Sequence, residues 1–458
     1  MATPYKVSIG TDNTGLWRII QSQEASQSVS KLLQQDMESH HVFLNDDEFH
    51  DHVPHHLLAL YGTGASPEDI SKAFQQRHPL QRPVQLEHES ILAELEASWS
   101  TAAKYLGNDL YYPDFLAYFQ KTIEARGYEA VVNDYLFKND DASNDILVRL
   151  HAGAIHPLIQ LMYGLEWKQP AIVAEALAQT CVHKLEQLDK ILLESERRAT
   201  TRASNDGETV RIQTLYERIR LDPKLRSAAR PEDREKIQDG ILARAPEEML
   251  SVLDDVEVKQ DELQERTAEM FHDIVLVASG AAIHPPKHVK YDFFLMHHIN
   301  AALIYPTIND QPWISNETKA RMLEWKIRMD LIQYTARGAP EYSVQQISNY
   351  APKTECGNTV REIGGSLHSL GDDGHAIKQA RAIAVCHELM RLYTDNPWAV
   401  LKGDAIWKQI QHMVVDAVES PGRMYVRGAG HEEAWKDVPL QSAPRKTEAE
   451  LRAIILGQ

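Results

Sequence analysis

The chain has 458 residues, 43% of them hydrophobic and 25% charged, which excludes a disordered or fibrous protein and allows a deep core. With 48 Lys and Arg against 66 Asp and Glu, the net charge is −18. An acidic surface repels phosphate groups, which excludes nucleic acid as a natural partner and disfavours anionic membranes. Three widely spaced cysteines, Cys181, Cys356 and Cys386, exclude a disulfide scaffold and favour a reducing compartment.

No targeting or membrane segment is expected. Residues 1–6 lack the basic stretch and apolar core of a secretory signal. The most apolar stretches, near 274–283 and 293–305, are too short for a bilayer span of about 20 residues or are broken by histidines. We therefore expect a cytoplasmic protein. Its oligomeric state stays open, a homo-oligomer included.

Apolar residues at three- and four-residue spacing predict helices along nearly the whole chain. Residues 1–30 are polar and form an arm. Pro54 fits the first turn of the helix that follows it, and Ser66 is a natural N-cap for the next one. Predicted helices cover roughly 28–43, 55–61, 88–106, 113–126, 128–137, 142–152, 157–166, 170–195, 246–280, 291–305, 315–337, 342–349, 373–395 and 403–418.

Residues 196–240 are charged and rich in Ser, Thr and Arg, with turn signals at 204–207 and 222–223. This composition predicts a solvated surface excursion carrying one or two helices. Strand patterns and hairpin signals are missing from the sequence. We therefore predict an all-α fold: one large, irregular, bundle-like helical domain over residues 1–458 with a buried active-site cavity.

Signatures of common cofactors are missing. Two glycine pairs, at 62–64 and 428–430, lack both the third glycine and the preceding strand of a dinucleotide-binding turn. A P-loop lysine and a GxSxG elbow are also absent from the sequence. This argues against a Rossmann-type flavin or nicotinamide enzyme, while a different nucleotide site stays open.

The helix predicted near 373–395 places His375 and Lys378 on its apolar face, with Ala382 and Val385. An unpaired buried ammonium is costly, and burial lowers the pKa of a lysine. A neutral amine could pair with a carboxylate, act as a base, or add CO2 to become a carbamate ligand. Alternatively, Lys378 extends to solvent near the helix start.

Three further histidines face inward on other predicted helices. His56 lies one turn before Leu60, His156 opens a helix, and His297 lies in an apolar helix, with His298 as its substitute. Each could instead be a hydrogen-bonded core or cap residue. Four inward imidazoles and a lysine from separate helices nevertheless predict a metal site, and mixed N and O ligands suit non-haem iron.

Other polar residues are candidates for supporting roles. His52, Gln179 and His183 could orient the ligand imidazoles, although a structural polar network explains Gln179 and His183 equally well. Candidates for polar contacts with a substrate are Tyr61, Gln160, Tyr163 and Arg381.

Several stretches in chain order resemble the questin oxidase-like family of fungal secondary metabolism. They are NDDEFH at 45–50, HHLLALYGTGAS at 55–66, GAIHPLI at 153–159, EALAQ at 175–179, DFFLMH at 292–297, GDDGH at 371–375 and AWKDVP at 434–439. Each stretch is short, but together they span nearly the whole chain. In that family a second histidine often follows GAIHPLI, where this chain has Gln160, which points to an altered substrate preference.

The resemblance implies O2-dependent opening of an anthraquinone such as questin to a benzophenone. The step is described either as an NADPH-linked Baeyer–Villiger-type monooxygenation or as a metal-dependent dioxygenation, and the missing dinucleotide signature favours the metal. The expected centre is Fe(II) held by four histidines, with His375 and the carbamate-forming lysine also taking part in catalysis. Its expected ligands are His56, His156, His297, His375 and Lys378.

Overall fold

The computed structural model describes residues 1–45, 48–202, 209–353 and 356–441. Within these ranges the fold is all-α, as predicted, because backbone pairing of the β type is limited to isolated bridges. In the same part of the chain, no helix combines the length and the apolar character that a bilayer crossing requires. That the whole chain forms a single domain stays a prediction.

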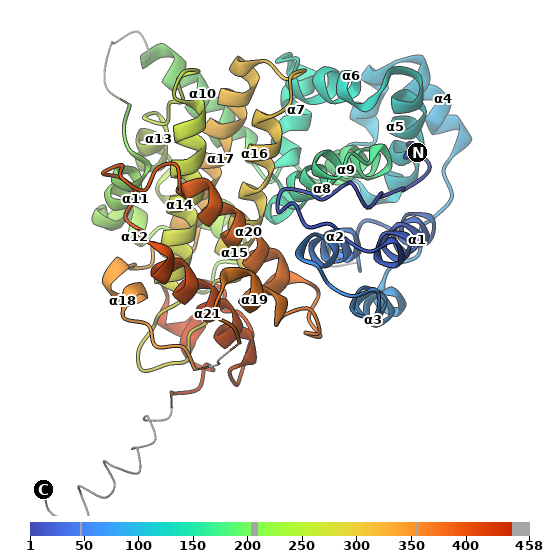
Figure 1. The fold of residues 1–458 in the computed structure, drawn as a ribbon. Coiled ribbons are helices and arrows are strands. Elements are labelled where there is room, and N and C mark those ends of the chain that lie inside the picture. The colour runs from blue at the N-terminus through green and yellow to red at the C-terminus, as the bar shows by residue number, and fades with distance from the viewer. Residues whose placement is uncertain (46–47, 203–208, 354–355, 442–458) are drawn as a thin grey trace, which may run out of the picture.

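The N-terminal half lies on one side of the molecule, in blue to green in Figure 1. Its helices are α1 (Gln23–Ser39), α2 (Val53–Thr63), α3 (Pro67–Arg77), η1 (His78–Leu80), α4 (Glu89–Ala97), η2 (Trp99–Lys104), η3 (Asp109–Tyr111), α5 (Tyr112–Arg126), α6 (Tyr128–Val132), η4 (Asn133–Phe137), α7 (Asp141–Leu150), η5 (Gly153–Ile155), α8 (His156–Glu166) and α9 (Pro170–Val182).

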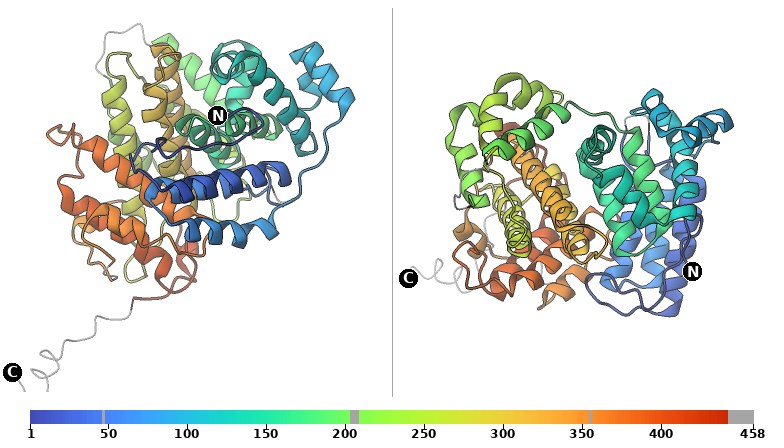
Figure 2. Two further views of the ribbon diagram at one scale, coloured as in Figure 1. Left: turned by 45° about the vertical axis from the view of Figure 1, so that its right-hand side comes forward. Right: turned by 90° about the horizontal axis from the view of Figure 1, so that it is seen from above.

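The remaining helices form the other side, and the two views in Figure 2 agree on this division. They are α10 (Asp189–Arg202), α11 (Ile212–Leu221), α12 (Pro223–Arg226), η6 (Lys236–Leu242), α13 (Pro246–Leu253), α14 (Leu263–Ala281), α15 (Phe293–Ala302), α16 (Ile304–Asn309), α17 (Asn316–Ala336), α18 (Val344–Ser348), α19 (Val360–Gly365), α20 (His375–Met390), α21 (Asp404–Glu419) and η7 (Glu432–Trp435).

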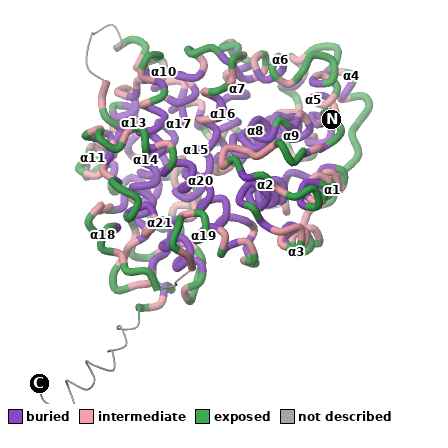
Figure 3. Tube along the Cα trace, viewed as in Figure 1, coloured by how far each residue is buried: buried purple, intermediate pink, exposed green. Residues whose placement is uncertain are grey.

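The two sides meet along α2, α8, α15 and α20. Helix α2 packs against both α8 and α20, and α8 packs against α15 and α16. A buried ion pair between Glu166 of α8 and Arg381 of α20 joins the sides. Glu166 also accepts the backbone N–H of Leu16 at 2.7 Å, which fixes the N-terminal arm to the same place. Figure 3 shows that this junction is buried.

Three predicted helices are interrupted in the structure. The helix expected at 88–106 is divided into α4 and η2 by an extended residue, Ser98. The helix expected at 170–195 stops at Val182, because the chain turns to an extended conformation at His183. The helix expected at 246–280 is divided into α13 and α14. Apolar spacing continued across all three breaks and therefore concealed them.

The segment 196–240 carries helices α11 and α12, as expected, and one face of α11 packs against the core. Leu215, Tyr216 and Ile219 of α11 and Leu225 of α12 are fully buried. Their positions repeat at three- and four-residue spacing, so one face of α11 packs against the core while the charged face dominates the composition. The turn expected at 204–207 lies outside the described residues.

Removing the charge of Glu166 should destabilise the fold strongly. Glu166→Gln leaves the guanidinium of Arg381 buried without its carboxylate, which typically costs about 3–5 kcal/mol. The control Glu94→Gln breaks an exposed pair with Lys104 and should cost about 1 kcal/mol or less. Urea unfolding of the two variants measures both values, and equal losses would contradict the role given to the buried pair.

Candidate metal centre

Four buried imidazoles converge between the two sides of the molecule. They belong to His52 before α2, His156 at the start of α8, His297 in α15 and His375 at the start of α20. The Nε2 atoms of His52 and His156 are 2.9 Å apart, and those of His297 and His375 are 3.2 Å apart. Ring nitrogens of His52, His297 and His375 all lie within 4.8 Å of one another.

Two of these rings are oriented by backbone carbonyls. Nδ1 of His156 lies 2.7 Å from the carbonyl oxygen of Gly153, and Nδ1 of His297 lies 2.6 Å from that of Phe293. A carbonyl oxygen can only accept a hydrogen bond, so in both rings Nδ1 donates. The Nε2 atom of each neutral ring is therefore left with its lone pair.

The carboxylate of Asp373 orients the other two rings. One of its oxygens accepts from Nδ1 of His52 at 3.1 Å, and the other accepts from Nδ1 of His375. Burial raises the pKa of Asp373, but His375 and His52 outweigh this and hold it well below its usual value. Its neighbour Asp372 accepts backbone N–H groups at the start of α20, which leaves Asp373 free for the imidazoles.

This donor set fits a transition-metal cation. Burial lowers the pKa of His52 to about 3 and holds the pKa values of His156 and His297 well below the usual range, so these rings are neutral. Lone pairs that face one another in a buried place repel, and a cation between them would remove that repulsion. Donation from Nδ1 to a carbonyl or carboxylate is also the usual arrangement of metal-binding histidines.

Lys378 lies beside this group, 2% exposed, so it does not extend to solvent. Burial lowers its pKa to about 8, although Asp373 and Asp372 oppose the shift. No hydrogen bond joins its Nζ atom to a described residue. In contrast, Nζ of Lys290 donates to two backbone carbonyls, and Lys326 pairs with Asp330.

His56 lies apart from the four imidazoles. Its ring packs against Gly374, where an added Cβ would come within 2.5 Å of Cγ of His56. Among the described residues, neither a ring contact nor a hydrogen bond links it to the four. His52 takes this place instead, because it precedes the first turn of α2 and its side chain points across to Asp373 and His156.

The candidate substrate contacts are spread over different surroundings. Tyr163 stacks on His55 with ring centroids 5.3 Å apart, and its hydroxyl is buried without a hydrogen-bond partner. The guanidinium of Arg381 lies 5.8 Å from the centre of the Tyr163 ring, and its Nε and Nη1 atoms are buried without a hydrogen-bond partner. Tyr61 donates to the carbonyl of Gly10 at 3.3 Å, on the side of the N-terminal arm.

Gln160 and His298 belong to separate polar groups. Gln160 donates to Glu175 at 3.1 Å and lines a small cavity with Asp36 and Asp51. His298 lies 2.5 Å from Asp330, which also holds Lys326.

A second layer of imidazoles supports His156. His183 donates from Nδ1 to the backbone carbonyl of Gln179 at 2.7 Å, and its Nε2 atom lies 2.8 Å from that of His50. His50 stacks on His156 with centroids 3.8 Å apart. Gln179 thus contributes its carbonyl rather than its side chain. Neither His50 nor Asp373 was among the predicted site residues, although HDH at 50–52 contains His50 and GDDGH at 371–375 contains Asp373.

The sequence profile of the questin oxidase-like family matches residues 49–383, which include all four imidazoles and Lys378. The chain belongs to the questin oxidase-like family.

Relatives of this questin oxidase-like chain cover almost its full length. The Baeyer–Villiger oxidase ptaJ of Pestalotiopsis fici is 32% identical over 96% of this chain and 99% of its own. A questin oxidase of Aspergillus fumigatus is 34% identical over 91% and 94%. The oxidoreductase AflY of Aspergillus parasiticus is 33% identical over 91% and 84%. All three names describe oxidation, which supports an oxidoreductase.

An added methyl group at Gly153 should disturb the imidazole stack of the questin oxidase-like fold. Gly153 has a φ of +56°, and its Cβ would overlap His183 and lie 3.0 Å from Nε2 of His50. Gly64 is a matched control, because its backbone is left-handed (φ +89°, ψ +22°) and its Cβ would make only ordinary contacts with Ile19, at 3.6 and 3.7 Å. Both Gly→Ala variants carry about 1–2 kcal/mol of backbone strain, and crowding should cost Gly153→Ala a further ~1–3 kcal/mol. Chemical unfolding measures the difference between the two variants in the free energy of unfolding. Equal losses would mean that the imidazole stack moves aside without cost.

Proposed function

We propose that this protein is a non-haem iron oxygenase that opens an anthraquinone ring to a benzophenone in fungal polyketide biosynthesis. Family membership and the printed names of the relatives support the reaction class. The observation that carries the iron is that ring nitrogens of His52, His297 and His375 lie within 4.8 Å of one another, with Nε2 of His156 2.9 Å from that of His52. Three or more nitrogen ligands with an open position suit the activation of O2.

The proposed ligands are His52, His156, His297 and His375, with Lys378 as a fifth, oxygen-donating ligand. His52 replaces His56 in this set, since only His52 has its Nε2 atom within the group. As a neutral amine, Nζ of Lys378 would attack CO2, form an N–C bond and release one proton, which gives a carbamate anion. Its burial without a hydrogen-bond partner supports this role.

The protein's own groups would orient the reaction. Asp373 holds two rings at a fixed angle through one carboxylate. Bound iron would supply O2 activation. Tyr163 and Arg381 are proposed to contact the polar oxygens of a flat substrate, because both are buried and the guanidinium lies 5.8 Å from the centre of the Tyr163 ring. The four imidazoles, Lys378, Tyr163 and Arg381 are buried, which limits the access of bulk water to the centre, while the Asp373 side chain is 31% exposed.

A second candidate is a metal-free, NADPH-dependent Baeyer–Villiger-type monooxygenase. It is favoured by the names of relatives, among them the Baeyer–Villiger monooxygenase AacuH of Aspergillus aculeatus, 30% identical over 93% of each chain. Oxygen uptake with an anthraquinone substrate separates the two. Uptake that survives metal removal and requires NADPH supports the second candidate, whereas uptake that needs iron supports the first.

Elemental analysis should find about one iron per wild-type chain and much less in His52→Ala and Lys378→Ala. His56→Ala should retain the metal, because its ring lies against Gly374 and outside the group. His298→Ala is a control for the loss of a buried histidine that pairs with a carboxylate elsewhere. Iron that is kept in His52→Ala and lost in His56→Ala would reverse the assignment.

Reloading should depend on CO2 if Lys378 becomes a carbamate. Stripped wild-type protein should take up iron more tightly when bicarbonate is supplied, because the added carboxylate supplies an anionic oxygen ligand. Lys378→Ala should show no bicarbonate effect. Metal titration followed by absorbance measures both, and equal uptake with and without bicarbonate in the wild type would remove the carbamate.

A further inference from the structure

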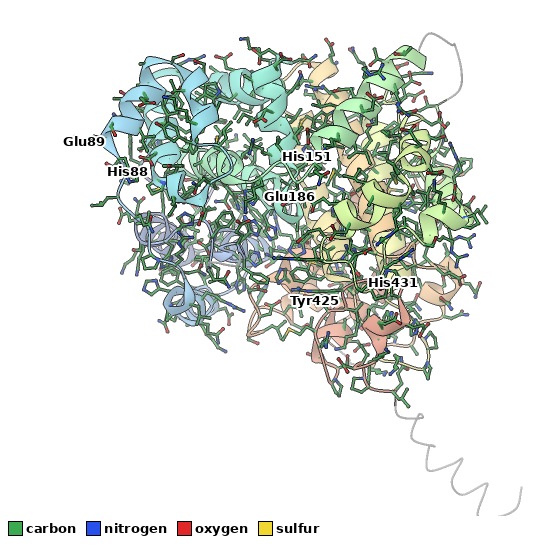
Figure 4. The ribbon with its side chains drawn as sticks, turned by 180° about the vertical axis from the view of Figure 1, so that it is seen from behind. His88, Glu89, His151, Glu186, Tyr425 and His431 are labelled. Carbon is green, nitrogen blue, oxygen red and sulfur yellow. The ribbon has the colours of Figure 1, made fainter. Side chains whose placement is uncertain are left out.

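The molecule carries a net charge of −18, yet one of its cavities is largely basic. This cavity, which we term the arginine pocket, has a volume of about 490 Å³ and lies between η6, α15, α17 and the segment before η7. Arg234, Lys236, Arg337, Arg423 and Arg427 line it, opposed by the carboxylates of Glu186, Glu235 and Glu433. Figure 4 labels Glu186 and His431, which reach the pocket from separate segments.

Arg337 is the unusual member of this pocket. Five arginines are buried in the described structure, and four of them pair with a carboxylate: Arg149 with Asp145, Arg266 with Glu269, Arg328 with Glu324 and Arg381 with Glu166. Arg337 is 5% exposed, and its side chain forms neither an ion pair nor a hydrogen bond with a described residue. Its Nε atom is buried without a partner.

The nearest carboxylate does not satisfy Arg337. Both carboxylate oxygens of Asp292 already accept backbone N–H groups. Oδ1 accepts from Phe294 and Leu295. Oδ2 accepts from Gly428 and Ala429. The charge of Asp292 only partly opposes the burial that lowers the pKa of Arg337. A buried guanidinium without a counter-ion is costly, so the pocket is arranged for an anion that the chain does not supply.

Other groups in the pocket point to the kind of anion. Nε2 of Gln333, one helical turn before Arg337, is buried without a partner, and so is Nε2 of His431. The guanidinium of Arg337 lies 4.2 Å from the centre of the Phe294 ring. Hydrogen-bond donors beside an aromatic face match a flat ring that carries a carboxylate or an ionised phenol.

The pocket shares its walls with the imidazole group. Glu186 accepts the backbone N–H of Gly153, whose carbonyl orients His156. Phe294 follows Phe293, whose ring centroid is 4.5 Å from that of His297 and 5.1 Å from that of His375. Two segments that line the arginine pocket therefore also contact the imidazole group.

We propose that the arginine pocket binds an aromatic anion through Arg337, with Gln333 and His431 as further donors. The identity of the anion rests on the proposed function. In this reaction one atom of O2 is inserted between a ring carbonyl carbon and the adjacent aromatic carbon, and water then splits the resulting ester into a carboxyl group on one ring and a phenol on the other. The second atom of O2 leaves as water and takes two electrons from a reductant of the NADPH class. The pocket would thus hold either an ionised anthraquinone before the reaction or a benzophenone carboxylate after it.

Calorimetric titration of the purified full-length protein tests this without turnover. The probes are anthraquinone-2-carboxylate for the substrate side and 2-benzoylbenzoate for the product side, each compared with its uncharged parent ketone. We expect at least one carboxylate to bind about 10-fold or more tightly than its parent, because a hydrogen-bonded ion pair forms. Arg337→Gln should remove this preference. The carboxylate that binds more tightly identifies the side of the reaction.

Arg423→Gln is the matched control, because Arg423 lines the same pocket but is exposed and pairs with Asp437. It should change the affinity by no more than about 2-fold. If Arg337→Gln does not fold, Gln333→Met replaces it and should weaken carboxylate binding by about 3- to 10-fold.

Three results would overturn the proposal: no preference for the charged probes, a preference that survives Arg337→Gln or its replacement, or displacement of the probes by NADPH or inorganic phosphate. Because binding is read without metal or activity, failure here is separate from failure of the iron assignment. A chain that binds the carboxylates but contains no iron would count only against the proposed function.

Discussion

The centre of this molecule depends on how each imidazole uses its Nδ1 atom. A neutral histidine has one donor and one acceptor nitrogen, so an Nδ1–H bonded to a carbonyl or carboxylate fixes which nitrogen keeps a lone pair. His52, His156, His297 and His375 all have this bond, and their Nε2 atoms face one another. The backbone carbonyls and Asp373 thus determine that Nε2 is the nitrogen that keeps a lone pair in each ring.

Three of the four imidazoles are brought together because they lie at the starts of helices. His156 and His375 are the first residues of α8 and α20, and His52 immediately precedes α2. A side chain at a helix start can point along the axis, which lets rings from separate helices meet at one place. Gly374 and Gly153 then supply the left-handed backbone that brings these starts close together. The iron proposed there follows from this geometry together with the family.

The sequence predicted much of this, for identifiable reasons. Apolar spacing is a local property, so the all-α class and most helix ranges could be predicted, and His297, His375 and Lys378 were predicted to face inward. The sequence could not predict which of His52 and His56 would lie among the other imidazoles. Their positions depend on where α2 begins and on Asp373, which is 321 residues from His52 along the chain. Composition did not reveal the buried face of α11 within 196–240, since its buried residues are a minority of that helix.

Long-range pairing also explains why the arginine pocket escaped the sequence. Arg337 ends a long helix in an ordinary way, and nothing local shows that it will lack a carboxylate when four other buried arginines have one. The acidic surface would repel an aromatic anion at a distance, and a basic pocket offsets this where the anion must dock. Glu186 and Phe294 line this pocket, and they also belong to the segments that orient His156 and His297. The proposed anion would supply the negative charge that the buried guanidinium of Arg337 lacks within the described structure.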